Sequence, residues 1–260
     1  MRPKISILMP AIRQERWNDL FLSIADSLES MDNFELILVS PYNLPEDLST
    51  IANIKLITDY GSPTRCFNIA LEAAEGELVT WGADDGKYLP GKLKQVVEKL
   101  EARNNKKHVI ALSQMEDKHV YNKEFCRINK HHQLRSSFIQ DDFVLFPTAV
   151  MHTDFMRAIG GLDCRFQGHA MAHIDFAIRA QTLGAVVEFE DDICLHLSHM
   201  MGPSGDHGPI HYSQLQEDEP LFRSTYSVDN TERIKQMATP STVANWKSQP
   251  SVWRWRFKNA

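Results

Sequence analysis

Hydrophobic residues gather in short blocks along the first 113 residues, and polar residues separate these blocks. Five of them have the length and composition of buried β-strands: residues 4–10, 34–40, 53–58, 77–81 and 108–113. Between them, apolar residues recur every three or four positions, which predicts three helices, near residues 17–28, 63–75 and 93–100. Strands that alternate with helices of this length are typical of a parallel α/β sheet.

The pattern is looser in the second half of the chain. We expect an irregular excursion at residues 114–143, which are mostly polar. Beyond it, periodicity predicts a strand, a short helix, a longer helix and a final strand, at residues 143–152, 153–159, 172–184 and 185–190. From residue 200 onward the chain is rich in Gly, Pro, His and acidic residues, and no regular structure is predicted there.

Composition places the chain among soluble globular proteins. Of its 260 residues, 43% are hydrophobic and 24% are charged, which is enough apolar material for a real core. The net charge of −6 argues against a nucleic-acid partner, and no apolar run approaches the roughly 18 residues of a membrane span. Four cysteines are scattered without a paired motif, which favours reduced thiols in a cytoplasmic protein: Cys66, Cys126, Cys164 and Cys194.

Two adjacent aspartates, Asp84 and Asp85, directly follow the predicted strand at residues 77–81. In an open α/β sheet, ligands bind at the carboxyl ends of the strands. Paired carboxylates there are suited to Mg²⁺ or Mn²⁺. Asp and Gly are also common in ordinary turns, so from these residues alone both interpretations stay open.

Three segments occur in an order and at spacings that resemble the nucleotide-sugar glycosyltransferases of the GT-A fold, family-2 type: residues 5–28, 60–86 and 160–185. The resemblance covers about residues 4–200. It implies an α/β protein with a GT-A (Rossmann-like) open mixed sheet flanked by helices and an irregular C-terminal segment. It also implies transfer of a sugar from a nucleotide-diphosphate sugar to an acceptor hydroxyl, with inversion as in most of the family.

The resemblance also implies a division of the chain. Residues 1–200 would form one catalytic domain, with a nucleotide-binding half at 1–113 and an acceptor half at 114–200. Residues 201–260 would be a loop and tail that pack on the same domain. The acceptor would be a glycan, a lipid-linked molecule or another hydroxyl compound.

Donor-binding positions follow residue by residue from the family pattern. The first strand and its following loop hold the nucleotide base, the second strand ends at the base, a helix supplies an arginine and an asparagine, and a late loop closes over the diphosphate. The matching residues here are Pro10, Ala11, Arg13, Ser40, Arg65, Asn68 and His207. Ser40 stands where the family usually has aspartates, which is a departure from the pattern.

The family's metal site is the third implication. Asp84 and Asp85 match the acidic motif that binds the ion, and Asp84 would also contact the donor. The family often adds one histidine ligand after the last core strand, which would be His199 or His196 here. A divalent cation would neutralise the negative charge that develops on the leaving nucleoside diphosphate. Gly82 occupies the position of the motif's first acid, so one contact to the ribose or the sugar is missing.

The general base for the acceptor hydroxyl has two candidates on the predicted helix at 172–184. Ala172 and His173 stand where the family has its acidic pair, and Asp175 matches the next family acid. His173 and Asp175 are about 200° apart on a helix, so only one of them faces the cleft. Asp175 is the favoured base and His173 its rival. A structural role is open for each: an ion pair of Asp175 with Arg179, and a core position for His173.

Two other functions fit parts of the sequence. Gly82, Ser40 and Ala172 are also what a weakly active nucleotide-sugar-binding protein would show. Four histidines at 196, 199, 207 and 211 could instead hold zinc in a hydrolase. Residues 245–260 alternate aromatic and basic side chains, which suits either weak contact with an anionic membrane surface or a strand that packs on the domain.

Overall fold

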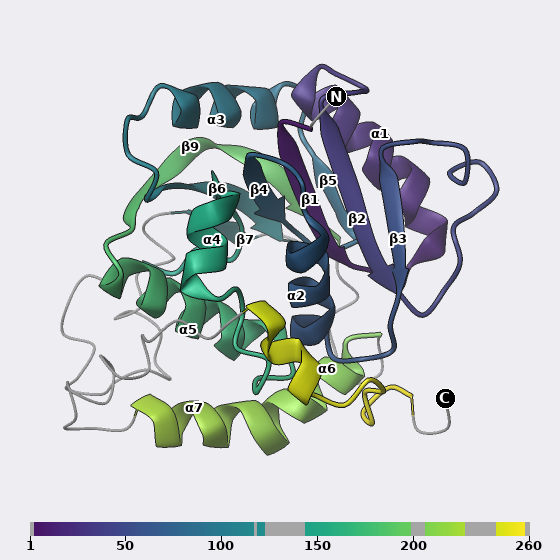
Figure 1. Cartoon of the computed structure of the whole chain (residues 1–260), viewed down its shortest axis with the longest axis vertical. Coiled ribbons are helices and arrows are strands. Elements are labelled where there is room, and N and C mark those ends of the chain that lie inside the picture. The colour runs from purple at the N-terminus through teal and green to yellow at the C-terminus, as the bar shows by residue number, and fades with distance from the viewer. Residues whose placement is uncertain (1–2, 117–118, 123–143, 199–205, 227–242, 258–260) are drawn as a thin grey trace.

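One mixed β-sheet runs through the molecule (Figure 1). The computed structural model describes residues 3–116, 119–122, 144–198, 206–226 and 243–257. Within these residues the sheet has nine strands: β1 (Ile5–Pro10), β2 (Phe34–Ser40), β3 (Ile54–Thr58), β4 (Leu78–Trp81), β5 (Gly86–Tyr88), β6 (His108–Glu116), β7 (His119–Tyr121), β8 (Ala149–His152) and β9 (Val186–Leu197). Their order is β3-β2-β1-β4-β8-β6-β9-β5, and β7 pairs with β6.

Strand direction changes along this order. β1, β2, β3 and β4 run parallel to one another, as the alternating strands and helices predict. β8 is antiparallel to both of its neighbours, β4 and β6, while β6 and β9 are parallel. The prediction of an open mixed sheet flanked by helices is therefore confirmed. The five strands predicted within residues 1–113 all run in the same direction, but the antiparallel β8 separates β4 from β6.

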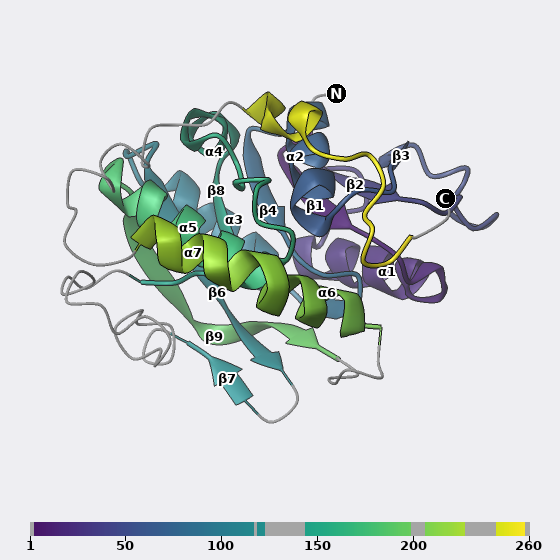
Figure 2. The same cartoon turned by 90° about the horizontal axis from the view of Figure 1, so that it is seen from below.

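Helices cover both faces of the sheet and create two cores (Figures 1 and 2). α1 (Trp17–Leu28), which follows the short 3-10 helix η1 (Gln14–Arg16), packs with α3 (Lys92–Glu101) against one face. α2 (Pro63–Ala73), α4 (Thr153–Ile159) and α5 (His169–Thr182) pack against the other. The alternation along β1 fixes this division, because Ile5, Ile7 and Met9 enter the first core and Leu8 enters the second.

Local signals in the sequence explain where α2 begins and where α4 ends. Ser62 caps α2, since its hydroxyl accepts a hydrogen bond from the N–H of Arg65, and Pro63 occupies the first helical turn. Gly160 ends α4 with a φ of 91°, a left-handed conformation that favours glycine. Both ends agree with the sequence prediction.

The segment after residue 200 corrects the prediction of no regular structure. A helical stretch made of α6 (Gly208–Ser213), a π-helix η4 (Gln214–Asp218) and α7 (Glu219–Tyr226) packs beside α5 (Figure 2). Phe222 and Tyr226 of α7 are buried in the same core as α5. The helices were missed because they are short and their apolar positions depend on this tertiary contact.

The described tail packs on the domain, as one interpretation of its sequence expects. A 3-10 helix, η5 (Val243–Ser248), contacts α2, and Trp253 is buried. The predicted terminal strand is reduced to a single bridge between Tyr60 and Val252. No helix in the described part of the chain is long and apolar enough to cross a membrane.

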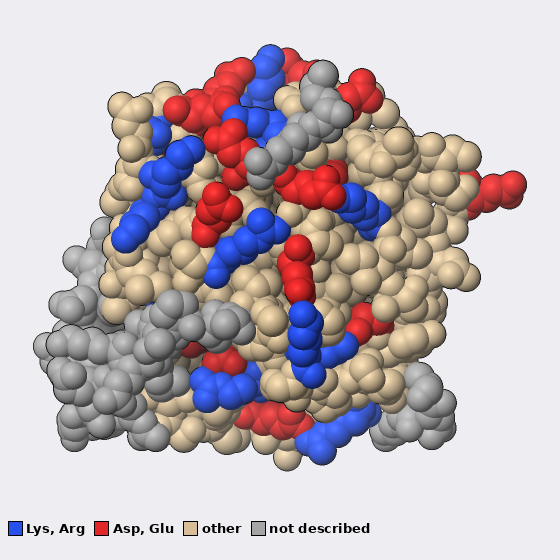
Figure 3. Space-filling view, in the orientation of Figure 1, with Lys and Arg blue, Asp and Glu red and all other residues tan. Residues whose placement is uncertain are grey.

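Charged side chains are dispersed over the face seen in Figure 3, where basic and acidic groups lie next to one another. That face carries no continuous basic surface of the kind that binds nucleic acid. Three of the four cysteines are buried free thiols, as predicted, and Cys126 lies outside the described residues.

Candidate active site

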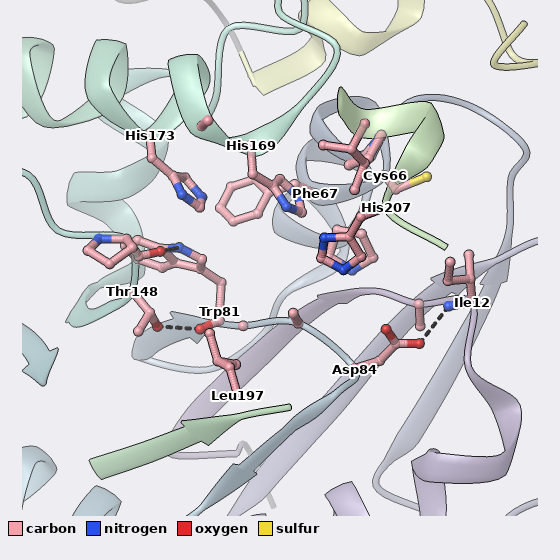
Figure 4. Close-up of a pocket in the computed structure, with 18 of the residues that line it drawn as sticks. Ile12, Cys66, Phe67, Trp81, Asp84, Thr148, His169, His173, Leu197 and His207 are labelled. Carbon is pink, nitrogen blue, oxygen red and sulfur yellow. Dashed lines mark hydrogen bonds between the residues drawn. The ribbon is translucent and has the colours of Figure 1, made fainter. Parts of the chain in front are cut away.

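A cavity of about 420 Å³ opens at the carboxyl ends of β1 and β4 (Figure 4). The loop after β1 and the turn after β4 form one end of it, where Ile12, Asp84 and His207 lie. The first turns of α5 form the other end, where His173 lies near Trp81 and Thr148. This is the edge at which open α/β sheets bind their ligands.

Asp84 holds the loop after β1 in place. Its Oδ2 accepts hydrogen bonds from the backbone N–H groups of Ile12 and Arg13, both at 2.6 Å, and from the indole of Trp17 at 3.1 Å. Its Oδ1 accepts one from the guanidinium of Arg13. The carboxyl is 1% exposed, so these four donors account for a buried charge. Neither interpretation of the acidic turn had included this structural role.

Arg13 is a partly buried cation among three carboxylates. Besides its contact with Asp84, its guanidinium lies 3.4 Å from Oδ2 of Asp85, and its Nε donates to Oδ2 of Asp206 at 2.7 Å. Its Nη2 donates to Nε2 of His207 at 2.9 Å. Burial opposes its charge, but the nearby carboxylates outweigh burial and raise the pKa of Arg13.

Two stacked imidazoles, from His169 and His173, line the other part of the cavity. Their ring centroids are 5.3 Å apart and their planes differ by 4°. Burial lowers the pKa of His169 to about 4 and that of His173 well below its ordinary value of 6.5, so both are neutral at pH 7. Nε2 of His173 is buried and has no hydrogen-bond partner among the described residues.

Asp175 faces away from the cavity. Its Oδ2 accepts a hydrogen bond from Nε of Arg179 at 2.8 Å, and its Oδ1 accepts one from the hydroxyl of Tyr226 at 2.5 Å. The side chains of Asp175 and Arg179 are 1% and 3% exposed, so the ion pair is buried rather than superficial. The expected angular separation on the helix therefore holds, and His173 is the member of the pair that lines the cavity.

The other predicted donor-binding residues divide into two groups. Pro10, Ala11, Arg13 and His207 line the cavity. Ser40, Arg65 and Asn68 are buried outside its lining and bind the protein itself. The hydroxyl of Ser40 accepts from the N–H of Tyr42 at 3.1 Å.

Arg65 and Asn68 fasten the tail to α2. Arg65 pairs with Asp59 at 2.8 Å and donates to the carbonyl oxygen of Trp246 at 2.5 Å. Asn68 donates to the side chain of Asn245 at 2.8 Å. Both side chains therefore position the segment that supplies part of the cavity wall.

The predicted metal ligands do not form a metal site within the described residues. These residues contain no group of three His, Cys, Asp or Glu side chains that could hold an ion. Asp84 is engaged by Arg13. Asp85 and His196, on β9, line a second cavity of about 770 Å³, which shares Asp84 with the first. His199 lies outside the described residues. The donor set therefore does not fit a metal as it stands, and the metal stays a prediction.

The described histidines proposed as zinc ligands also lie apart from one another. His196 and His207 line different cavities. His211 lies on α6, so the described histidines of the run do not converge.

Sequence reasoning missed several residues of the cavity wall. The tail contributes Trp253, Arg256 and Phe257. Outside the lining, the turn before α6 supplies Asp206 as a partner of the lining residue Arg13. The alternating aromatic and basic residues of the tail indicated a binding surface. They indicate a cavity wall only once the bridge between Tyr60 and Val252 is known.

No family model matches the chain. Among solved structures, it is similar to residues 1–349 of S. aureus TarS, a glycosyltransferase. The TarS complex with UDP is 17% identical, with a TM-score of 0.60 over 90% of this chain and 69% of that one. The complex with UDP-GlcNAc is 16% identical, with a TM-score of 0.61 over 99% and 73%. At this identity the likeness shows the fold alone, which this chain shares with the TarS structures.

Proposed function

We propose that this protein is a glycosyltransferase that moves a sugar from a nucleoside-diphosphate sugar to an acceptor hydroxyl. One observation carries the proposal: a single cavity holds a guanidinium at one end and, at the other, a neutral imidazole with a nitrogen that has no partner among the residues the structure describes. A nucleoside-diphosphate sugar needs a cation at its phosphates, and its acceptor needs a base. The TarS structures with UDP and UDP-GlcNAc support this class of donor.

His173 is the base in this proposal. As the acceptor oxygen attacks C1 of the sugar, the bond between C1 and the diphosphate oxygen breaks, and Nε2 of His173 takes the acceptor proton. Its neutral state at pH 7 keeps the nitrogen available as an acceptor. Asp175, the favoured base of the sequence analysis, is instead committed to Arg179 and Tyr226. Direct displacement of this kind inverts the configuration at C1.

The first experiment is a calorimetric titration with UDP, followed by an assay of UDP release from UDP-GlcNAc. We expect saturable UDP binding and slow release of UDP by hydrolysis when no acceptor is present. Absence of UDP binding, with a range of other nucleoside diphosphates also failing, would contradict the proposal. Binding without any release would favour the weakly active binding protein instead.

A further inference from the structure

We propose that Arg13 binds the donor diphosphate directly, through the edge of its guanidinium that Asp206 now occupies, and supplies there the positive charge that the sequence resemblance assigns to a divalent cation. The inference rests on the proposed function, because it presumes a diphosphate in this cavity. It goes beyond the expected role of Arg13, which was to hold the nucleotide base.

The buried side of Arg13 is fixed by the protein. Asp84 accepts hydrogen bonds from both the guanidinium and the backbone N–H of Arg13. Asp85 lies next to the same guanidinium. These two carboxylates are 1% and 0% exposed. They hold the guanidinium charged and oriented, so that its Nε edge faces Asp206. Arg13 itself lines the cavity.

Asp206 is an anion that a phosphate can replace. Its side chain is 37% exposed, and it lies on the turn before α6. Its carboxylate accepts from Nε of Arg13 at 2.7 Å, the geometry that a phosphate oxygen would take. The contact shows that this edge of Arg13, a residue of the cavity lining, binds an oxyanion.

A second guanidinium lies beside the same turn. Nη2 of Arg256 donates to the backbone oxygen of Asp206 at 2.7 Å, and Arg256 lines the cavity. While Asp206 is in place, three carboxylates face two guanidinium groups, and the local charge repels a diphosphate. When Asp206 leaves, the charges balance and the repulsion falls.

A divalent ion bound by Asp84 would compete with Arg13 for that carboxylate. The loss of this contact would weaken the pairing of a largely enclosed guanidinium, which is costly. The arrangement therefore favours an arginine over a metal as the group that faces the phosphates.

The test is a set of UDP titrations of the full chain, in EDTA and in Mn²⁺. For the unchanged protein we expect dissociation constants in the two conditions that agree within about threefold. Arg13→Gln should weaken binding by about tenfold or more in EDTA, because it removes a charge-assisted contact. Asp206→Asn should tighten it severalfold, because it removes a competing anion.

Asp192→Asn is the matched control for Asp206→Asn, since Asp192 is an exposed partner of Lys92 far from the cavity. It should leave UDP binding unchanged. A melting curve checks that the Arg13→Gln variant folds. If that variant does not fold, Asp206→Asn still tests whether Arg13 binds the diphosphate. UDP binding that requires Mn²⁺, and that Asp206→Asn leaves unaltered, would overturn this inference alone. No binding to the unchanged protein in either condition would overturn the proposed function as well.

Discussion

At the scale of single residues, His173 and Asp175 have opposite surroundings on the same helix. His173 points into the cavity, and Asp175 is enclosed by Arg179 and Tyr226. We expect His173→Asn to lower turnover of UDP-GlcNAc by about 10²–10⁴, the usual contribution of a general base. UDP affinity, measured by calorimetry, should barely change. Normal turnover in this variant would remove His173 from the mechanism.

Asp175→Asn should act on stability instead. Removing one partner of a buried ion pair leaves the other charge uncompensated, which costs about 3–5 kcal/mol in free energy of unfolding. This is well above the value of an exposed pair, which was the structural alternative in the sequence analysis. Urea denaturation gives the measurement, and Arg223→Gln, which removes a more exposed i,i+4 pair with Glu219, is the control. A stable but inactive Asp175→Asn would return Asp175 to the role of base.

The buried histidines also set a pH dependence of stability. His169 has a folded-state pKa of about 4 and an unfolded value near 6.5, so the unfolded chain binds more protons between these values. Its contribution is complete above pH 6.5 and is lost as the pH falls towards 4. We expect His169→Gln to flatten the fall in unfolding free energy over this range by about 1–3 kcal/mol. Urea denaturation at pH 4.5 and 7.5 measures this difference. An equal fall in unfolding free energy for the variant and the unchanged protein would contradict the prediction.

At the scale of elements, the π-helix η4 connects to α5 through one carboxyl group. Asp218 is fully buried and accepts the N–H groups of Gln167 and Gly168, each at 2.7 Å, at the start of α5. Gly168 is the N-cap of that helix, so Asp218 satisfies N–H groups that the helix leaves unpaired. The contact holds the α6–α7 stretch against the helix that carries His169 and His173.

Asp218 gives a pH effect of opposite sign to that of His169. Burial raises its pKa to about 6, above its unfolded value, so the folded state binds more protons between pH 4 and 6. Its stabilising contribution is present below pH 4 and is lost as the pH rises through 6. We expect the unfolding free energy of the normal protein to fall relative to that of Asp218→Asn by about 1–3 kcal/mol across this window. Parallel urea-stability curves for the two proteins would show that Asp218 does not titrate there.

How far the sequence predicts these elements depends on where the stabilising contacts come from. α1, α2 and α3 carry their own apolar stripe, and periodicity predicts them well. β5 and the second half of β9 were missed because they are stabilised by pairing with each other across more than 100 residues. The role of Asp84 was missed for the same reason, since its partners come from a loop about 70 positions earlier.

At the scale of the whole molecule, the tail completes the cavity. Arg65 and Asn68 hold it on α2, and it places Trp253 and Arg256 in the cavity wall. We expect deletion of residues 243–260 to lower the melting temperature by about 5–10 °C, given roughly 2–4 °C per kcal/mol for a protein of this size. The same deletion should also weaken UDP binding. Deletion of residues 258–260 alone is the control, and equal UDP affinity in both truncated proteins would contradict a binding role for the tail.

The position of β8 has a consequence for synthesis of the protein. β8 separates β4 from β6, although it is made after both of them. A nascent chain that has just exposed residue 113 therefore carries two inner strands whose shared partner is still untranslated. Translation of the missing stretch takes on the order of seconds, during which these apolar edges need protection by chaperones or by the ribosome surface. The sheet strands within residues 1–113 thus cannot finish pairing before β8 is made.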